Sequence, residues 1–217
     1  MVIIQNATYI HPNKDILFQG LNLVVNKQEK IALIGNNGVG KSTLLKAIAS
    51  EVKLHAGSID CASTPYYIPQ LLDKYNAMSI AKVLAIEDKL KAFHAILEGQ
   101  MDEQLLDILN DDWTIEDRVQ QALNRWNLIG LKLDQPLSTL SGGQKTKVFL
   151  AGIDIHDPEL ILMDEPSNHL DLESRELLYQ FIENCNKTLL LVSHDRALLR
   201  LIPEMAEMSK NGISKYG

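Results

Sequence analysis

The sequence predicts an α/β fold with a mostly parallel core sheet and one helical insert. Continuous apolar runs occur at residues 31–34, 160–163 and 189–192, which is typical of strands that helices cover on both faces. A glycine-rich stretch at 35–42 follows the first run and precedes a helical pattern. Between residues 79 and 127, apolar side chains recur every three or four positions, which indicates helices.

Composition limits the classes of protein to consider. The chain has 217 residues, 46% of them hydrophobic, and can bury one core with a small appendage. Its formal net charge of −7 argues against a broadly basic nucleic-acid-binding surface. Cys61 and Cys185 are far apart and lack metal-ligand spacing, so reduced thiols are expected. No apolar run approaches the ~20 residues of a membrane span, and the first residues lack a signal-peptide pattern, so we expect a cytoplasmic location without direct membrane insertion.

The glycine-rich stretch has the pattern of a phosphate-binding loop. Glycines allow the backbone to curl around an anion, and the following helix adds its positive N-terminal end. Lys41 would contact the β- and γ-phosphates of a nucleoside triphosphate, and Ser42 would be a ligand of Mg²⁺. A plain glycine-rich turn at a helix start is the alternative, which the strand before it and the helix after it disfavour. The predicted loop comprises Gly35, Asn36, Asn37, Gly38, Val39, Gly40, Lys41, Ser42 and Thr43.

The remaining elements follow in chain order. Residues 2–34 are β-rich, and Tyr66–Ile68 is expected to be a strand that leads to the polar Gln70. The predicted insert contains roughly three helices, the last beginning near Thr114 with a capping arrangement to Asp117. Another helix is expected over residues 173–182.

The insert is acidic and contains the only two tryptophans. Residues 71–137 carry 12 acidic and 7 basic side chains, a net charge of −5. Trp113 and Trp126 are interpreted as packing anchors of this insert in preference to a platform for stacking bases.

Three polar clusters follow the three apolar strands and should converge at one edge of the sheet. Asp164 occupies the place where phosphate-loop enzymes keep a Mg²⁺-binding carboxylate, and Glu165 is the candidate that orients or deprotonates water. His194 would hydrogen-bond the γ-phosphate or that water. The alternatives are two acidic residues of an ordinary turn and a histidine that serves packing or faces solvent.

The segment Leu140 to Gln144 precedes another predicted helix. Ser141 and Gln144 fit a capping box, which requires neither of the glycines between them. Because each glycine costs a helix about 1 kcal/mol relative to alanine, we expect another group to approach this backbone closely. A phosphate at this helix end is the simplest candidate, and a head-to-tail dimer would supply it.

These motifs together resemble an ATP-binding-cassette (ABC) ATPase domain. The resemblance covers roughly residues 1–210, and its motifs are, in order, Walker A (35–42), the Q-loop (Gln70), the signature (140–144), Walker B (160–165), the D-loop (167–171) and the switch histidine (His194). The runs 164–171, 112–118 and 193–196 resemble the ABC-F subfamily. The resemblance implies an ABC core over residues 1–70 and 138–217, with an amino-terminal antiparallel β subdomain. Residues 71–137 would be the helical or arm insert.

The resemblance also implies a function. ATP and Mg²⁺ would bind with Gln70 as a ligand of the metal or of water, and Ser141, Gly142, Gly143, Gln144 and Asp171 would act on nucleotide between two cassettes. His11 or Tyr9 would stack on adenine, with His11 favoured by register.

The ABC-F subfamily consists of tandem-cassette, ribosome-associated translation or antibiotic-resistance factors. This chain would therefore be the amino-terminal cassette of a longer ATPase, weakly active alone. Two alternatives are the nucleotide-binding subunit of an ABC membrane transporter and a nucleotide-dependent switch with negligible turnover.

Overall fold

The computed structural model describes residues 1–100 and 102–216, which form two compact units. The strand unit comprises Met1–Gln70, Pro158–Asn168 and Arg175–Gly217, and the helical unit comprises Leu71–Asp157 and His169–Ser174. The predicted division into 1–70 and 138–217 against 71–137 differs from these units and stays a prediction; Met101 and Gly217, which it includes, lie outside the described residues.

The strand unit contains a six-stranded sheet in the order β5-β6-β7-β3-β8-β9. Neighbouring strands are parallel except β8 and β9, which are antiparallel, so the predicted mostly parallel sheet is confirmed. β6 and β7 are buried at every position, as their unbroken apolar sequences predict. The strands are β5 (Tyr66–Ile68), β6 (Leu160–Asp164), β7 (Thr188–Val192), β3 (Lys30–Ile34), β8 (Glu204–Ser209) and β9 (Gly212–Tyr216).

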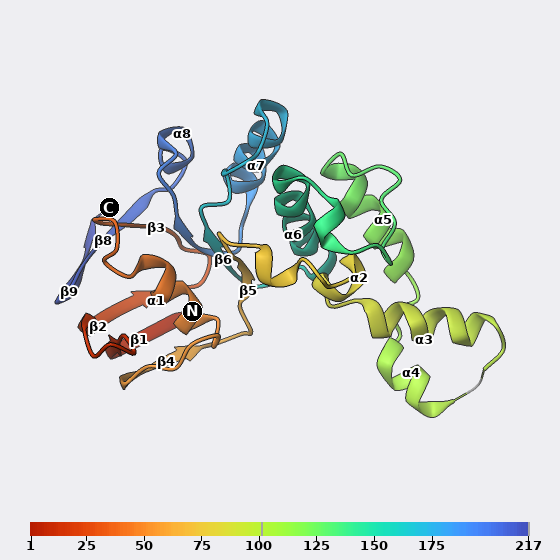
Figure 1. Ribbon diagram of the computed structural model, residues 1–217, viewed down its shortest axis with the longest axis horizontal. Coiled ribbons are helices and arrows are strands. Elements are labelled where there is room, and N and C mark those ends of the chain that lie inside the picture. Colours follow the sequence, from red (N-terminus) through yellow and green to blue (C-terminus); the bar gives the residue numbers. More distant parts are fainter. Residues whose placement is uncertain (101, 217) are drawn as a thin grey trace. The chain divides into compact units, whose positions relative to one another are not determined.

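A second, antiparallel sheet in the order β2-β1-β4 completes the strand unit and confirms the expected β subdomain. Its strands are β1 (Val2–Ile10), β2 (Ile16–Val25) and β4 (Ala56–Cys61). Helix α1 (Lys41–Ile48) lies between the two sheets (Figure 1) and buries Leu44, Leu45 and Ile48 in the core that they share. The start of α1 is therefore held by packing from both sides.

The order of the strands decides which loops meet. β6, β7 and β3 are adjacent and parallel, so the residues that follow them lie at one edge of the sheet. The segments after β7 and β8 are short: α8 (Arg196–Leu199) and the β8–β9 hairpin, which the sequence patterns did not predict. Helix α7 (Leu172–Asn184) agrees with the helix expected over 173–182.

Among the described residues between 79 and 127, the helical unit has four helices where the sequence predicted roughly three. They are α2 (Ile80–Val83), α3 (Glu87–Leu97), α4 (Glu103–Leu109) and α5 (Ile115–Arg125), followed by α6 (Gly142–His156). Single 3₁₀ turns lie at Asp73–Tyr75 and Leu137–Thr139. Thr114 stands at the N-cap of α5, but its side chain makes no capping hydrogen bond, so that detail was wrong.

The two tryptophans have different environments. Trp126 is buried, and its indole N–H donates a hydrogen bond to Asp154 Oδ2 on α6 at 2.9 Å. Trp113 keeps 47% of its surface exposed. The prediction of a packing anchor is therefore confirmed only for Trp126.

Within the described ranges, no helix combines the length and the apolar character that crossing a bilayer requires.

Candidate nucleotide site

The loop between β3 and α1 has a backbone that only glycine adopts readily. Gly35 has φ of 142°, and a Cβ there would lie 2.4 Å from the carbonyl oxygen of Met208. Gly38 has φ of 77°, but a Cβ there would meet only open space. The loop is thus packed against β8 at its start and open at Gly38, as a loop that wraps a ligand requires.

Lys41 begins α1 and is buried among acceptors. Its Nζ donates hydrogen bonds to the carbonyl oxygens of Gly35 at 2.7 Å and Asn36 at 3.2 Å. Burial lowers the pKa of Lys41, while the carboxylates of Glu165 and Asp164 oppose that change. A buried ammonium held mainly by neutral carbonyl groups can exchange them for phosphate oxygens and gain a charge-assisted contact.

Asp164 ends β6 next to the first turn of α1. Ser42 Oγ donates to Asp164 Oδ1 at 3.0 Å, and the hydroxyl of Tyr67 donates to Oδ2 at 3.4 Å. Burial raises the pKa of Asp164, although both hydrogen bonds act in the opposite direction. A hydroxyl beside a desolvated carboxylate fits a hard cation such as Mg²⁺.

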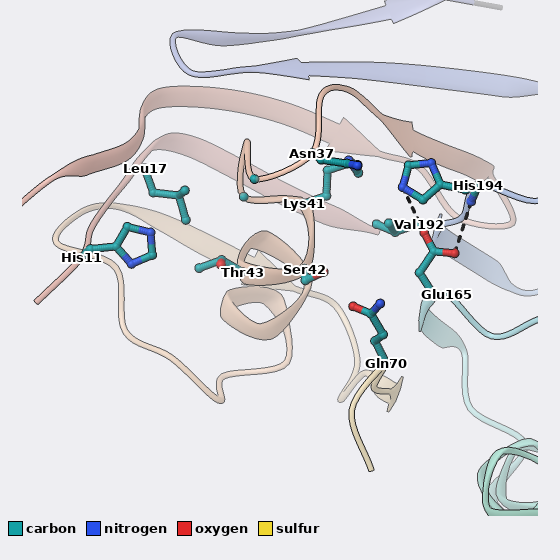
Figure 2. A pocket seen from close by; sticks show the side chains of 12 residues that line it. His11, Leu17, Asn37, Lys41, Ser42, Thr43, Gln70, Glu165, Val192 and His194 are labelled. Atoms are coloured by element: carbon teal, nitrogen blue, oxygen red, sulfur yellow. Dashed lines mark hydrogen bonds and ion pairs between the residues drawn. The ribbon is translucent and has the colours of Figure 1, made fainter. Parts of the chain in front are cut away.

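Glu165 follows in a left-handed backbone conformation, with φ of 53°. Its Oε2 accepts a hydrogen bond from the backbone N–H of His194 at 3.2 Å, and its Oε1 lies 3.5 Å from His194 Nε2. Figure 2 shows both contacts. Burial raises the pKa of Glu165, and the His194 backbone hydrogen bond is the leading opposing effect. Left-handed backbone at a non-glycine residue is a form of strain that is common at functional sites.

Lys41, Glu165 and His194 face one cavity of about 500 Å³ in the strand unit (Figure 2). Its lining includes ten predicted site residues, namely His11, Asn37, Gly38, Gly40, Lys41, Ser42, Thr43, Gln70, Glu165 and His194. Asp164 is not among the lining residues and reaches the site through its bond with Ser42, which is. Val39 does not line the cavity: its side chain is buried in the core. Gly35 and Asn36 reach the site through the carbonyls that hold Lys41.

Three neighbours of the cavity were missed by sequence reasoning. Leu17 and Val192 belong to its lining, and the hydroxyl of Tyr67 donates a hydrogen bond to the Asp164 carboxylate. Tyr67 pairs in register with Leu162 across β5 and β6, so its position was available only from the sheet.

His11 lies at the end of the cavity that also contains Leu17. Tyr9 instead packs against the core, with its ring centroid 6.0 Å from that of Phe18 and 5.9 Å from that of His11. The arrangement favours His11 over Tyr9 as the residue that would meet a nucleotide base.

The signature segment lies in the helical unit, where contacts within the chain explain why glycine occupies positions 142 and 143. A Cβ on Gly143 would lie 2.6 Å from the carbonyl oxygen of His169, and one on Gly142 would lie 3.3 Å from the His169 Cβ. The expected close approach is therefore present, but His169 makes it. These glycines no longer require a phosphate, although they remain compatible with one.

Polar groups of the signature segment and of Asp171 make hydrogen bonds to neighbouring residues. Ser141 Oγ accepts from the Gln144 N–H at 3.3 Å, and Gln144 Oε1 accepts from the Ser141 N–H at 3.0 Å, which completes a capping box. Asp171 Oδ1 accepts from Ser174 N at 2.8 Å and Ser174 Oγ at 2.5 Å, and these bonds lower the pKa of Asp171. The signature residues and Asp171 are not among the residues that line the cavity.

A glycine-rich loop, a buried lysine and paired carboxylates at the ends of parallel strands define a phosphate-loop nucleotide-binding protein. Residues 18–168 match the family described as ABC transporter, and the chain belongs to that family of ATP-binding cassettes.

The chain is similar over most or all of its length to curated proteins. The chain is 32% identical to the tylosin resistance ATP-binding protein TlrC of Streptomyces fradiae, over 93% of this chain and 41% of that protein. It is 30% identical to ABC transporter F family member 2 of Arabidopsis thaliana, over 100% of this chain and 29% of that protein. The chain thus spans less than half the length of these curated relatives.

Among solved structures, a dimeric, post-hydrolysis ATP-binding cassette bound to ADP and phosphate superposes with a TM-score of 0.77. That match covers 100% of this chain and 98% of the solved chain at 20% identity, so it establishes the fold.

Proposed function

We propose that this chain binds ATP with Mg²⁺, hydrolyses it together with a second cassette, and forms half of a ribosome-associated ABC-F protein. One observation carries the proposal: Lys41 and Ser42, which would hold phosphate and metal, share a cavity with Glu165 and His194. The resemblance to an antibiotic-resistance protein and to F family members supports the ABC-F assignment.

The phosphate loop would bind the phosphates, and the end of β6 would help to bind Mg²⁺. Lys41 would move from its carbonyl acceptors to the β- and γ-phosphates, while backbone N–H groups of residues 36–43 surround the phosphate tail. Ser42, Asp164 and Gln70 would hold Mg²⁺, which would neutralise charge that develops on the phosphates. The base would stack on His11 beside Leu17.

Glu165 and His194 would act on the attacking water. Glu165 would accept its proton, and the raised pKa of the Glu165 carboxyl makes the carboxylate a stronger base than an ordinary glutamate. The backbone N–H of His194 holds one carboxylate oxygen, so the other remains directed at the cavity and the imidazole. The ring of His194 would then bond the γ-phosphate.

A second cassette would complete the site. Ser141, Gly142, Gly143 and Gln144 begin a long helix, α6, and Asp171 lies in the loop whose backbone packs on Gly143. Such a helix start is suited to receive the γ-phosphate bound by a partner cassette. The dimeric state of the solved cassette supports this arrangement.

The acidic insert bears on how a ribosome would be contacted. Residues 98–117 contain eight acidic and no basic side chains. Phosphate backbones repel such a surface. We therefore assign direct contact with RNA to other parts of the full-length protein.

The test uses the full-length gene product with Glu165 and its second-cassette counterpart changed to glutamine. Turnover should fall at least about 100-fold because the general base is lost, while ATP affinity stays within about twofold. The trapped protein should sediment with ribosomes through a sucrose cushion only when ATP is present. Glu176→Gln makes the same change at an exposed position of α7 and should leave turnover intact.

Two results would overturn parts of the proposal. Unchanged turnover in the Glu165→Gln protein would remove the catalytic assignment and favour the switch. Absence of the protein from the ribosome pellet, despite demonstrated ATP binding, would favour a transporter subunit instead.

A further inference from the structure

Asp195, the residue after His194, is held by contacts that the proposed mechanism does not use. Its Oδ1 caps α8, accepting from the N–H of Ala197 at 2.9 Å and of Leu198 at 3.3 Å. Its own N–H donates to Ser193 Oγ at 3.1 Å. Its Oδ2 accepts a hydrogen bond from the hydroxyl of Tyr179 on α7 at 2.6 Å.

In the contact between Tyr179 and Asp195, the phenol is the donor and the charged carboxylate is the acceptor, so the hydrogen bond is charge-assisted. Burial and the bond to Asp195 raise the pKa of Tyr179 to about 12, so the phenol remains a donor. Burial alone would raise the pKa of Asp195, but the Tyr179 hydrogen bond leads the effects that lower it below its usual value. A short bond between a phenol and a carboxylate is among the stronger contacts that a protein makes.

The contact lies one peptide away from the reacting groups. The N–H of His194 bonds Glu165, and the carbonyl carbon of His194 is joined to the nitrogen of Asp195. Rotation of Asp195 would therefore turn the peptide that sets the direction of the His194 ring. His194 itself is exposed, so its own packing restrains that ring little.

We propose that Tyr179 is a positioning residue for His194, because its hydroxyl fixes Asp195 and thereby holds His194 against Glu165. This inference rests on the proposed function for its catalytic consequence. Its structural part concerns the orientation of His194 and stands independently of turnover.

The test is Tyr179→Phe in the 217-residue chain, which removes only the hydroxyl, at a protein concentration high enough for the parent to turn over ATP. We expect kcat to fall about tenfold while KM and ATP affinity stay within about twofold, since Tyr179 acts on the orientation of His194 and not on phosphate binding. In nucleotide-free ¹H–¹⁵N spectra of the six histidine rings, the His194 signal should shift and the other five should stay. The His194→Ala spectrum identifies the signal.

Two controls separate positioning from stability. Tyr216→Phe makes the same change on the exposed edge of β9 and should alter neither kcat nor the spectrum. Tyr179→Phe should have no further effect on kcat in an Asp195→Ala background, because Tyr179 acts through Asp195.

The outcomes distinguish this inference from the proposed function. An active parent whose kcat is unchanged by Tyr179→Phe would overturn the inference, and so would an unchanged His194 signal. A parent that stays inactive even at concentrations where it forms a dimer with Mg²⁺ and ATP, with a shifted His194 signal in the variant, would overturn the proposed function and leave the positioning role in place.

Discussion

At the scale of single residues, Asp164 and Glu165 illustrate a conflict between stability and chemistry. Both carboxyls are buried, and burial raises the pKa of each. When the pKa of a carboxyl is higher in the folded than in the unfolded protein, the free energy of unfolding is highest at low pH and falls as pH rises through the folded-state pKa. The nucleotide-free protein therefore holds these charges at a cost that Mg²⁺ and phosphate binding would offset.

Asp164→Asn should accordingly make the nucleotide-free protein more stable at pH 8. The substitution removes a desolvated charge and keeps an oxygen that can accept from Ser42. The difference in Tm from the parent should shrink as pH falls toward the ordinary pKa of aspartate, about 3.9, because protonation of the parent carboxyl in the folded state removes the desolvated charge. Thermal unfolding from pH 4 to pH 8 measures this. A variant less stable than the parent at pH 8 would contradict the burial argument.

At the scale of elements, the start of α6 is fixed by one loop of the same unit. Gly143 lies under the carbonyl of His169, which has φ of 63°. Asp171 in the same loop accepts a hydrogen bond from the N–H of Ser174. Its Oδ2 lies 3.7 Å from Nζ of Lys147 on α6. The signature and residues 169–171 of the D-loop thus form one packed structure within the helical unit.

Gly143→Ala should destabilise the chain by about 1 to 3 kcal/mol, because the Cβ overlaps a backbone oxygen. Helix propensity alone predicts the opposite sign, a gain of about 1 kcal/mol. Urea unfolding of the nucleotide-free chain decides between the two. Gly142→Ala, whose Cβ meets a side-chain atom at 3.3 Å, is the matched control and should cost less.

The contact between α5 and α6 depends on Trp126. Trp126→Phe removes the indole donor from Asp154, whose other carboxylate oxygen accepts a hydrogen bond from Arg125. Loss of a hydrogen bond to a half-buried carboxylate should cost about 1.5 to 3 kcal/mol in urea unfolding. Trp113→Phe, at a position that is 47% exposed, should change stability by less than about 0.5 kcal/mol. Equal effects of the two substitutions would contradict the assignment of Trp126 as the anchor.

At the scale of the whole molecule, the cavity is lined by the proposed binding groups and the proposed base of one nucleotide site. The signature helix start is not among its lining residues. A complete site would then need a helix start from another cassette, and association would govern turnover.

ATP turnover per chain should therefore rise with protein concentration, and the total rate should approach second order in protein at low concentration. The Glu165→Gln chain should sediment as a monomer without nucleotide and as a dimer with Mg²⁺ and ATP in analytical ultracentrifugation. Rapid turnover that is independent of concentration would show that one cassette suffices.

Much of this protein follows from the sequence because the signals are local. Unbroken apolar runs mark strands buried on both faces, and the residues after them meet wherever the sheet is parallel, so Lys41, Ser42, Asp164, Glu165 and His194 could be grouped in advance. The mostly exposed β4 and the β8–β9 hairpin gave no comparable apolar signal.

Other features depend on contacts between residues distant in the chain, which only the tertiary structure decides. The approach of His169 to Gly143, the bond from Tyr67 to Asp164 and the bond from Tyr179 to Asp195 each join separate elements. Such contacts depend on strand register and helix packing, to which no single residue pattern corresponds. The sequence by itself therefore determined the chemistry of the site, and the tertiary structure decided which side chains hold that chemistry in place.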